Sequence, residues 1–169
     1  MARGEVAARN LIDEHQLTAL PIDPEKVAAS LGAVVIRQPG PVELSGMLLR
    51  RDGQDVIGIR AGLEPPRQRF TLAHLVGHLH LHARRDLILD TAARYSHPNL
   101  ASMPTDREEA EANRFAAALL VPEGTVRRMA VEADARTADQ LVDLLTPRFE
   151  VTRTAMAARL LNLGIINGA

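Results

Sequence analysis

Four of the six histidines in this 169-residue chain fall within nine residues, and three of them are evenly spaced. His74, His78 and His82 follow one another at intervals of four, so a helix would place them on one face, about one turn apart. Imidazoles at positions i and i+4 can bind one metal ion, which is the geometry behind the HExxH zinc motif. In a strand, His78, His80 and His82 would share a face instead.

A third metal ligand has to be a histidine or a carboxylate, because the chain contains no cysteine. The second strongly helical segment, residues 105–120, offers Glu108, Glu109 and Glu111. Glu108 is expected to cap that helix. Glu109 lies on the inward-looking face of the segment, where a buried carboxylate needs a partner. We therefore expect Glu109 to be the third ligand and keep Glu111 as the alternative.

The neighbours of these candidates have expected roles of their own. Glu111 has Arg114 three residues later, a spacing typical of a solvated pair. Asn113, one turn after Glu109, could orient His74 through a hydrogen bond. His82 could also support the site through a hydrogen bond or merely end its helix, and the second interpretation is favoured. The other three histidines, His15, His80 and His97, are expected to face solvent.

The two helices that must hold the site have clear signals in the sequence. The prolines at 65–66 open a segment that runs to residue 82, and its length favours a helix over a strand. Gly77 in the middle of this helix indicates close packing against a neighbour. The second helix begins with a capping box, in which Thr105 caps the first turn and Glu108 reaches back.

The other segments predict an α+β fold with a small antiparallel sheet. Apolar and turn-forming residues place further helices at 3–15, 24–31, 123–133, 137–145 and 153–163, and strands at 33–38, 44–49 and 56–60. The sequence RDG at 51–53 is a hairpin signal. Residues 84–104 are expected to form a long loop with a short extended piece at 87–89.

Composition narrows the class of protein. Hydrophobic residues make up 46% and charged residues 24%, which is typical of a folded domain. The net charge of −1 argues against direct binding of nucleic acid or of an anionic membrane surface. The longest apolar run, residues 115–121, is far shorter than the roughly 20 residues that span a bilayer. No signal peptide is recognised, so a cytoplasmic location is expected.

Both site helices carry motifs that resemble those of a known family. RFTLAHLVGHLHLH, residues 69–82, is similar to the RFTLAHExGHxxLH signature of the ImmA/IrrE metallopeptidases. EEAEANRFAAALLVP, residues 108–122, resembles their second signature, ExEANxFAxxLLxP. The N-terminal pattern is similar too, with a DPEKVAASLG-like segment and the strand LSGML. The resemblance covers nearly the whole chain.

The resemblance implies one zincin-like metallopeptidase domain over residues 1–169, with residues 137–166 as a helix-turn-helix-like helical closure. It implies zinc as the cofactor, with His74, His78 and Glu109 as ligands and Glu111 as the fallback. Members are typically bacterial, phage or mobile-element hydrolases that cleave or inactivate a helix-turn-helix repressor. The implied partner is therefore such a repressor or an antitoxin-like protein.

One residue departs from the family pattern: Leu75 stands where the family has a glutamate after the first histidine. In zincins that glutamate takes a proton from the attacking water and passes it to the leaving amine. A general base is typically worth about 10²–10⁴ in rate, and leucine cannot accept a proton. We therefore expect a metal-binding pseudo-peptidase or partner-binding protein. The alternative is an active protease with a substitute base, such as Glu111 or a carboxylate from residues 84–104.

Residues 56–60 are expected to form an edge strand above the site. An extended peptide could add to Val56, Ile57, Gly58 and Ile59 by backbone pairing, and Gly58 would permit its close approach. An ordinary edge strand that happens to contain a glycine is an equally weighted interpretation.

The C-terminal segment, residues 141–166, supports a rival function. Its rhythm resembles a helix-turn-helix unit, with Arg153 and Arg159 on the last helix, which would suit a DNA-binding regulator. Residues 123–169, however, contain six arginines and six acidic residues, and DNA-binding domains usually carry a clear positive face. A helical hairpin that completes the core is therefore the favoured interpretation.

Overall fold

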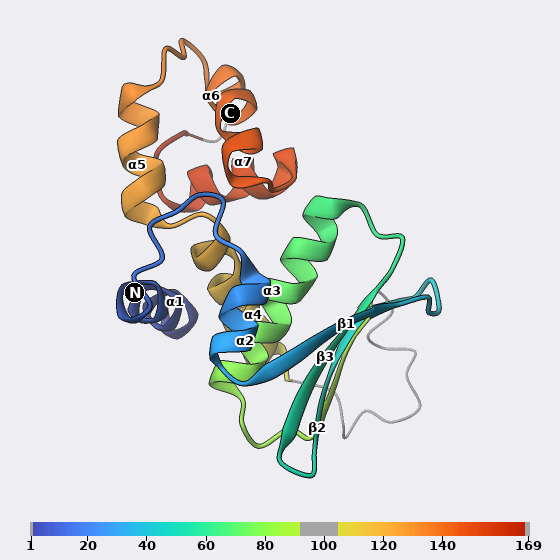
Figure 1. Cartoon of the computed structure of the whole chain (residues 1–169). Coiled ribbons are helices and arrows are strands. Elements are labelled where there is room, and N and C mark those ends of the chain that lie inside the picture. The colour runs from blue at the N-terminus through green and yellow to red at the C-terminus, as the bar shows by residue number, and fades with distance from the viewer. Residues whose placement is uncertain (1, 92–104, 168–169) are drawn as a thin grey trace.

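The computed structural model describes residues 2–91 and 105–167, and its helices and strands confirm the α+β class (Figure 1). The helices of the described ranges are α1 (Arg3–Glu14), α2 (Pro24–Ser30), α3 (Pro65–Leu81), α4 (Asp106–Leu120), α5 (Glu123–Glu132), α6 (Ala138–Phe149) and α7 (Arg153–Asn162). The strands are β1 (Ala33–Gln38), β2 (Leu44–Arg51), β3 (Gln54–Arg60) and β4 (Leu87–Thr91).

The helices begin and end close to the predicted residues where a local sequence signal, such as a capping residue, is present. The capping box of α4 is present, with Thr105 Oγ1 accepting from the Glu108 backbone and the Glu108 carboxylate accepting from the Thr105 backbone. The expected end of α6 at residue 145 is wrong, because α6 continues past Pro147 to the fully buried Phe149. The burial of a large aromatic side chain outweighs the backbone hydrogen bond that the proline removes.

Strand β4 includes the extended piece expected at residues 87–89. The part of the expected loop at 92–104, which contains His97, lies outside the described residues.

The sheet is mixed rather than antiparallel, with the strand order β1-β3-β2-β4. Strand β3 pairs in parallel with β1 and antiparallel with β2. The expectation that residues 56–60 form an edge strand is therefore wrong. The backbone groups of Val56, Ile57, Gly58 and Ile59 are engaged on both sides, so a peptide cannot add to this strand. Among the described strands, β1 and β4 are the edges of the sheet.

One face of the sheet packs on α3, and the register of the strands determines which residues lie there. Leu48 pairs with Ile57 on one side and with Ile88 on the other, and all three side chains are fully buried. Two residues before Leu48 on β2, Gly46 pairs with Ile59 and with Asp90. Paired residues project to the same face, so this second row also lies toward α3.

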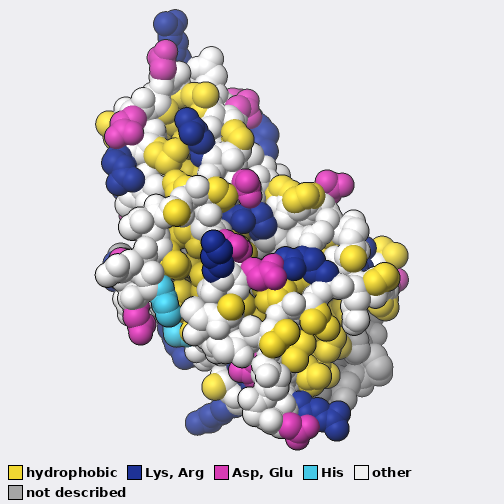
Figure 2. All heavy atoms as spheres, viewed as in Figure 1, with side chains coloured by type: hydrophobic (Ala, Val, Ile, Leu, Met, Phe, Trp, Pro, Cys, Tyr) yellow, Lys and Arg dark blue, Asp and Glu magenta, His cyan; other side chains and the backbone are white. Residues whose placement is uncertain are grey.

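The opposite face of the sheet presents two rows of apolar residues. The rows are Val34, Val56, Leu49 and Leu87, and Ile36, Gly58, Met47 and Leu89. Val34 and Ile36, on the edge strand β1, are 48% and 40% exposed. Hydrophobic side chains gather over the sheet in the space-filling view (Figure 2).

Two glycines allow the helices to approach one another closely. At Gly77 of α3, a Cβ atom would lie 3.1 Å from Phe115 Cδ1 and 3.2 Å from Ala112 Cα on α4. At Gly4 of α1, a Cβ atom would collide with the backbone carbonyl oxygen of Glu111. Helix α4 is thus held between α1 and α3. Among the described residues, none of the helices has both the length and the apolar character needed to cross a membrane.

Candidate metal centre

Helices α3 and α4 bring His74, His78 and Glu109 together. Oε2 of Glu109 lies 3.4 Å from His74 Nε2, and Oε1 lies 3.3 Å from His78 Nε2. One ligand atom from each residue lies within 4.8 Å of the other two. The two imidazoles are buried and their rings are 4.7 Å apart, at one turn of the same helix.

The donor atoms of this cluster fit a divalent transition metal. Nε2 of His74 and Nε2 of His78 are both buried, and neither has a hydrogen-bond partner. Buried polar atoms without a partner are rare in proteins and are often explained by an ion. Two imidazole nitrogens and one carboxylate oxygen form a donor set that zinc takes in enzymes.

The orientation of His74 is set from α4. Its Nδ1 lies 2.9 Å from Asn113 Oδ1, and the amide oxygen can only accept a hydrogen bond. His74 Nδ1 therefore carries the proton, and Nε2 keeps the lone pair that faces Glu109. Burial lowers the pKa of His74, and the neighbouring His78 lowers it further, against the opposite effect of Asp90 and Glu109. The imidazole is thus held neutral, as a metal ligand must be.

His82 extends the site on the other side. It caps the C-terminal end of α3, but it does more than end the helix, which corrects the favoured interpretation of the sequence. Its Nδ1 lies 2.9 Å from Nδ1 of His78, and its Nε2 lies 3.2 Å from Oε2 of Glu111.

Glu111 is not the solvated partner of Arg114 that its spacing suggests. It is 6% exposed, and its oxygens accept hydrogen bonds from His82, from Arg107 at 3.1 Å and from Arg3 of α1 at 2.9 Å. Burial raises its pKa, but the hydrogen bonds from His82 and Arg107 outweigh that effect and lower it. Glu111 is thus an ionised carboxylate, and it lies outside the cluster of His74, His78 and Glu109.

With both imidazoles neutral, the chain of contacts Arg3–Glu111–His82–His78 fixes which nitrogen of each histidine carries the proton. The Glu111 carboxylate can only accept, so His82 donates from Nε2 and its Nδ1 is left as an acceptor. His78 then donates from Nδ1 to His82 and keeps its lone pair on Nε2, toward Glu109. A histidine that is hydrogen-bonded at its second nitrogen is held in one tautomer and is a stronger metal ligand. No local sequence signal predicts this chain of contacts from Arg3 to His78, since Arg3 and Glu111 are 108 positions apart.

Position 75 contributes no polar group. Leu75 is fully buried, and its Cδ1 atom would lie 2.9 Å from a Cβ atom at Gly46. The Leu75 side chain is therefore packed between α3 and β2.

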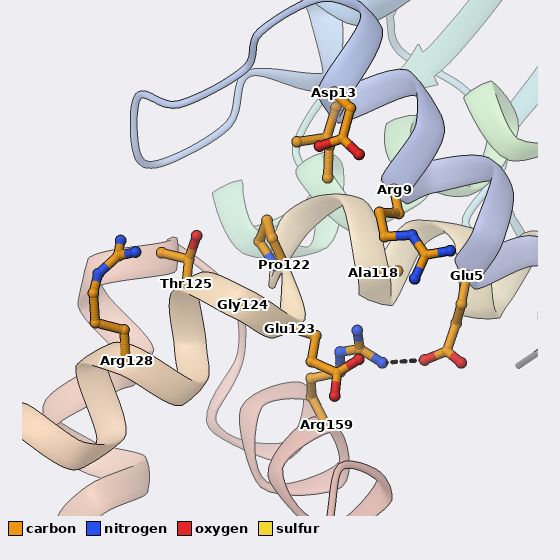
Figure 3. Close-up of a pocket in the computed structure, with 11 residues that line it drawn as sticks. Glu5, Arg9, Asp13, Ala118, Pro122, Glu123, Gly124, Thr125, Arg128 and Arg159 are labelled. Carbon is orange, nitrogen blue, oxygen red and sulfur yellow. Dashed lines mark hydrogen bonds and ion pairs between the residues drawn. The ribbon is translucent and has the colours of Figure 1, made fainter.

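Two of the cavities among the described residues are lined in part by α7. One, of about 350 Å³, is lined by residues of α1, α5 and α7, including the ion pair of Arg159 with Glu5 at 2.5 Å (Figure 3). None of its lining residues belongs to the metal cluster. The other, of about 410 Å³, is lined by Phe70 and Asn113, which both contact His74, and by residues of α7.

The arginines that would suit DNA contact have acidic partners within the chain. Arg153 pairs with Asp139 at 2.6 Å and with Asp143 at 2.8 Å, and Arg159 is only 5% exposed. These contacts favour a helical closure over a DNA-reading surface.

Comparison with known proteins identifies a match over most of the chain. The family model described as Peptidase_M78, IrrE N-terminal-like domain, matches residues 28–161. None of the curated proteins compared matches the sequence. A solved structure of a Mycobacterium tuberculosis transcriptional regulator is similar in fold, with a TM-score of 0.63 and 19% sequence identity. The similarity covers 95% of this chain but only 47% of the regulator, so the chain spans about half the length of that protein.

Proposed function

This chain belongs to the Peptidase_M78 family of IrrE N-terminal-like domains, and on that premise we propose that it is a zinc-binding member that acts on a helix-turn-helix repressor or antitoxin-like protein. We further propose that its hydrolytic step is impaired at Leu75, so that it works as a pseudo-peptidase or partner-binding protein.

The observation that carries the metal site is the pair of buried, unpartnered Nε2 atoms facing Glu109. His74, His78 and Glu109 would hold the zinc ion. When bound, zinc supplies a Lewis acid that polarises the scissile carbonyl and activates water. Asn113 and His82 would fix the tautomers of the two histidines and leave the Nε2 lone pairs, which face Glu109, for the ion.

The proposed impairment follows from the chemistry of the side chain at position 75. A buried leucine neither accepts a proton from water nor delivers one to a leaving amine. Loss of a general base typically costs about 10²–10⁴ in rate. Binding of a partner does not need that proton transfer, so recognition can persist where cleavage is slow.

The surface for an extended segment of the partner has to be an edge of the sheet. Strand β3 is excluded because it is paired on both sides. Of the two edge strands that the described residues form, β4 is the one that follows α3 directly along the chain. We therefore assign the role of the peptide-binding strand to β4, where an added strand would form backbone hydrogen bonds.

The test begins with the metal. Zinc content is measured in the purified protein and in His74→Ala, and we expect about one ion per chain that the variant loses. If the parent takes up no zinc, the proposed function is wrong.

The second step compares zinc-loaded parent, Leu75→Glu and Leu75→Gln on a helix-turn-helix repressor encoded beside the gene. Glutamine matches glutamate in size but accepts no proton, so it controls for the disturbed packing. We expect the parent and Leu75→Gln to bind the repressor and to cleave it at least 100-fold more slowly than Leu75→Glu. Equal cleavage rates for the parent and a folded Leu75→Glu would contradict the impairment.

A further inference from the structure

One carboxylate on the helix-facing side of the sheet, Asp90, has no assigned role. Asp90 is the fourth residue of the edge strand β4 and is partly buried. It pairs with Gly46 on β2, and the preceding pair on the same face, Ile88 with Leu48, is fully buried against α3. The Asp90 side chain therefore projects from the helix-facing side of the sheet, near its edge.

The contacts of Gly46 show which turn of α3 lies against this part of the sheet. A Cβ atom on Gly46 would lie 2.8 Å from Thr71 Cγ2 and 2.9 Å from Leu75 Cδ1. Asp90 thus lies opposite Gly46, and Gly46 packs against Thr71 and Leu75, which lie on either side of His74 in the sequence of α3.

Among the described residues, Asp90 has no side-chain partner. Across the described ranges, no residue forms a hydrogen bond or an ion pair with its carboxylate. Thr71, at the same level of α3, has a buried hydroxyl without a hydrogen-bond partner. Gly46, which Thr71 contacts, pairs with Asp90, so this unpartnered hydroxyl and the carboxylate flank the same position of β2.

The other acidic residues near the site are engaged. Glu108 forms the capping box and pairs with Arg85 at 2.7 Å. Glu111 accepts from His82, Arg107 and Arg3. Glu109 belongs to the cluster with the two histidines, whereas Asp90 does not.

We propose that Asp90 is the proton-accepting carboxylate of this site, acting from the sheet in place of the glutamate that position 75 lacks. This rests on the proposed function for the metal and for the class of substrate, a peptide bond. With Asp90 as the base, the chain keeps a slow hydrolytic activity despite the leucine at position 75.

The proton transfers balance around this residue. One O–H bond of the attacking water breaks and its proton moves to the Asp90 carboxylate, while the water oxygen bonds to the peptide carbonyl carbon. The C–N bond then breaks, and the proton on Asp90 moves to the leaving nitrogen. The products are a carboxylic acid, which keeps the second proton of the water, and an amine, and Asp90 is ionised again.

The experiment measures binding as well as cleavage. The affinities for zinc and for acetohydroxamic acid are determined by titration in the parent, Asp90→Asn and Asp86→Asn. A hydroxamic acid binds zinc and carries an O–H group that a carboxylate beside the ion accepts. Asp86 is exposed and lies just before β4, so Asp86→Asn makes the same change of charge away from the site.

We expect Asp90→Asn to bind zinc within about twofold of the parent and acetohydroxamic acid about tenfold more weakly, because a hydrogen bond to a charged group is lost. Residual cleavage of the repressor should fall in the same variant, and Asp86→Asn should match the parent throughout. Unchanged hydroxamate affinity in Asp90→Asn would overturn this inference while leaving the metal site intact. A tenfold loss of zinc affinity would also overturn it, since Asp90 would then be a ligand. A parent without zinc would instead overturn the proposed function.

Discussion

The Nδ1 atom of His82 lies 2.9 Å from the Nδ1 atom of His78, at the C-terminal end of the helix that carries both. Through this contact, His78 is linked to Glu111 of α4 and then to Arg3 of α1. The position of one proposed metal ligand therefore depends on three helices rather than one.

The first prediction concerns His82. His82→Ala removes the acceptor for His78 Nδ1–H, so His78 loses the partner that fixes its tautomer. Removal of such a partner typically costs about 10–100-fold in metal affinity. Competition with a chromophoric chelator measures the change. His80→Ala is the matched control, since His80 lies on the same helix but is exposed. Equal zinc affinities for the two variants would show that His82 has no part in the site.

The second prediction concerns the contact between α1 and α4. Gly4→Ala places a methyl group against the carbonyl oxygen of Glu111, so α1 must move. Overpacking of this kind typically costs about 1–3 kcal/mol in the free energy of unfolding. Urea unfolding measures it. Gly124→Ala is the control, because a Cβ atom there meets nothing within 4 Å, and it should leave stability unchanged or slightly raised. Similar losses in both variants would refute the close approach.

The third prediction concerns acid stability. Burial raises the pKa of Glu108, but hydrogen bonds from Arg85 and Thr105 prevail and lower it to about 2. A depressed carboxyl pKa stabilises the folded state above the unfolded value of about 4.5, and that contribution is lost as the pH falls toward 2. Glu108→Gln should therefore be less stable than the parent at pH 6, with a smaller difference at pH 3.

Thermal unfolding at the two pH values checks this result. The control is Glu132→Gln, at an exposed position on α5, for which we expect little difference at either pH. A gap between Glu108→Gln and the parent that stays the same from pH 6 to pH 3 would contradict the role of the ionised carboxylate.

Local signals made the helices predictable. Capping residues, prolines and apolar spacing act over a few positions, so the ends of α3, α4 and α7 follow from the sequence alone. The cluster of His74, His78 and Glu109 also followed from spacing on two such helices. Gly77 was correctly interpreted as a point of close packing, because a glycine in a helix interior needs a reason.

The order of the strands could not be predicted in this way. The segment at 56–60 reads as a strand, but nothing within it indicates whether it lies at an edge. Its parallel pairing with β1 depends on the path of the chain through β2. The burial of Glu111 was equally hidden, because its partners Arg3 and His82 come from distant positions while Arg114 is a near neighbour in sequence. Asp90 acquires its place beside α3 only through the register with Gly46.

The chain of contacts from Arg3 to His78 also bears on how much of the sequence the site requires. Similarity to the family starts at residue 28, so a boundary drawn from it would remove α1. That cut would take away the arginine that pairs with Glu111 and the glycine that lets α1 rest on α4. A chain shortened in this way keeps every residue of both family motifs but loses the contacts that orient His78 through Glu111 and His82. The segment that contains both motifs is thus shorter than the segment whose contacts hold the site in place, because the latter includes α1.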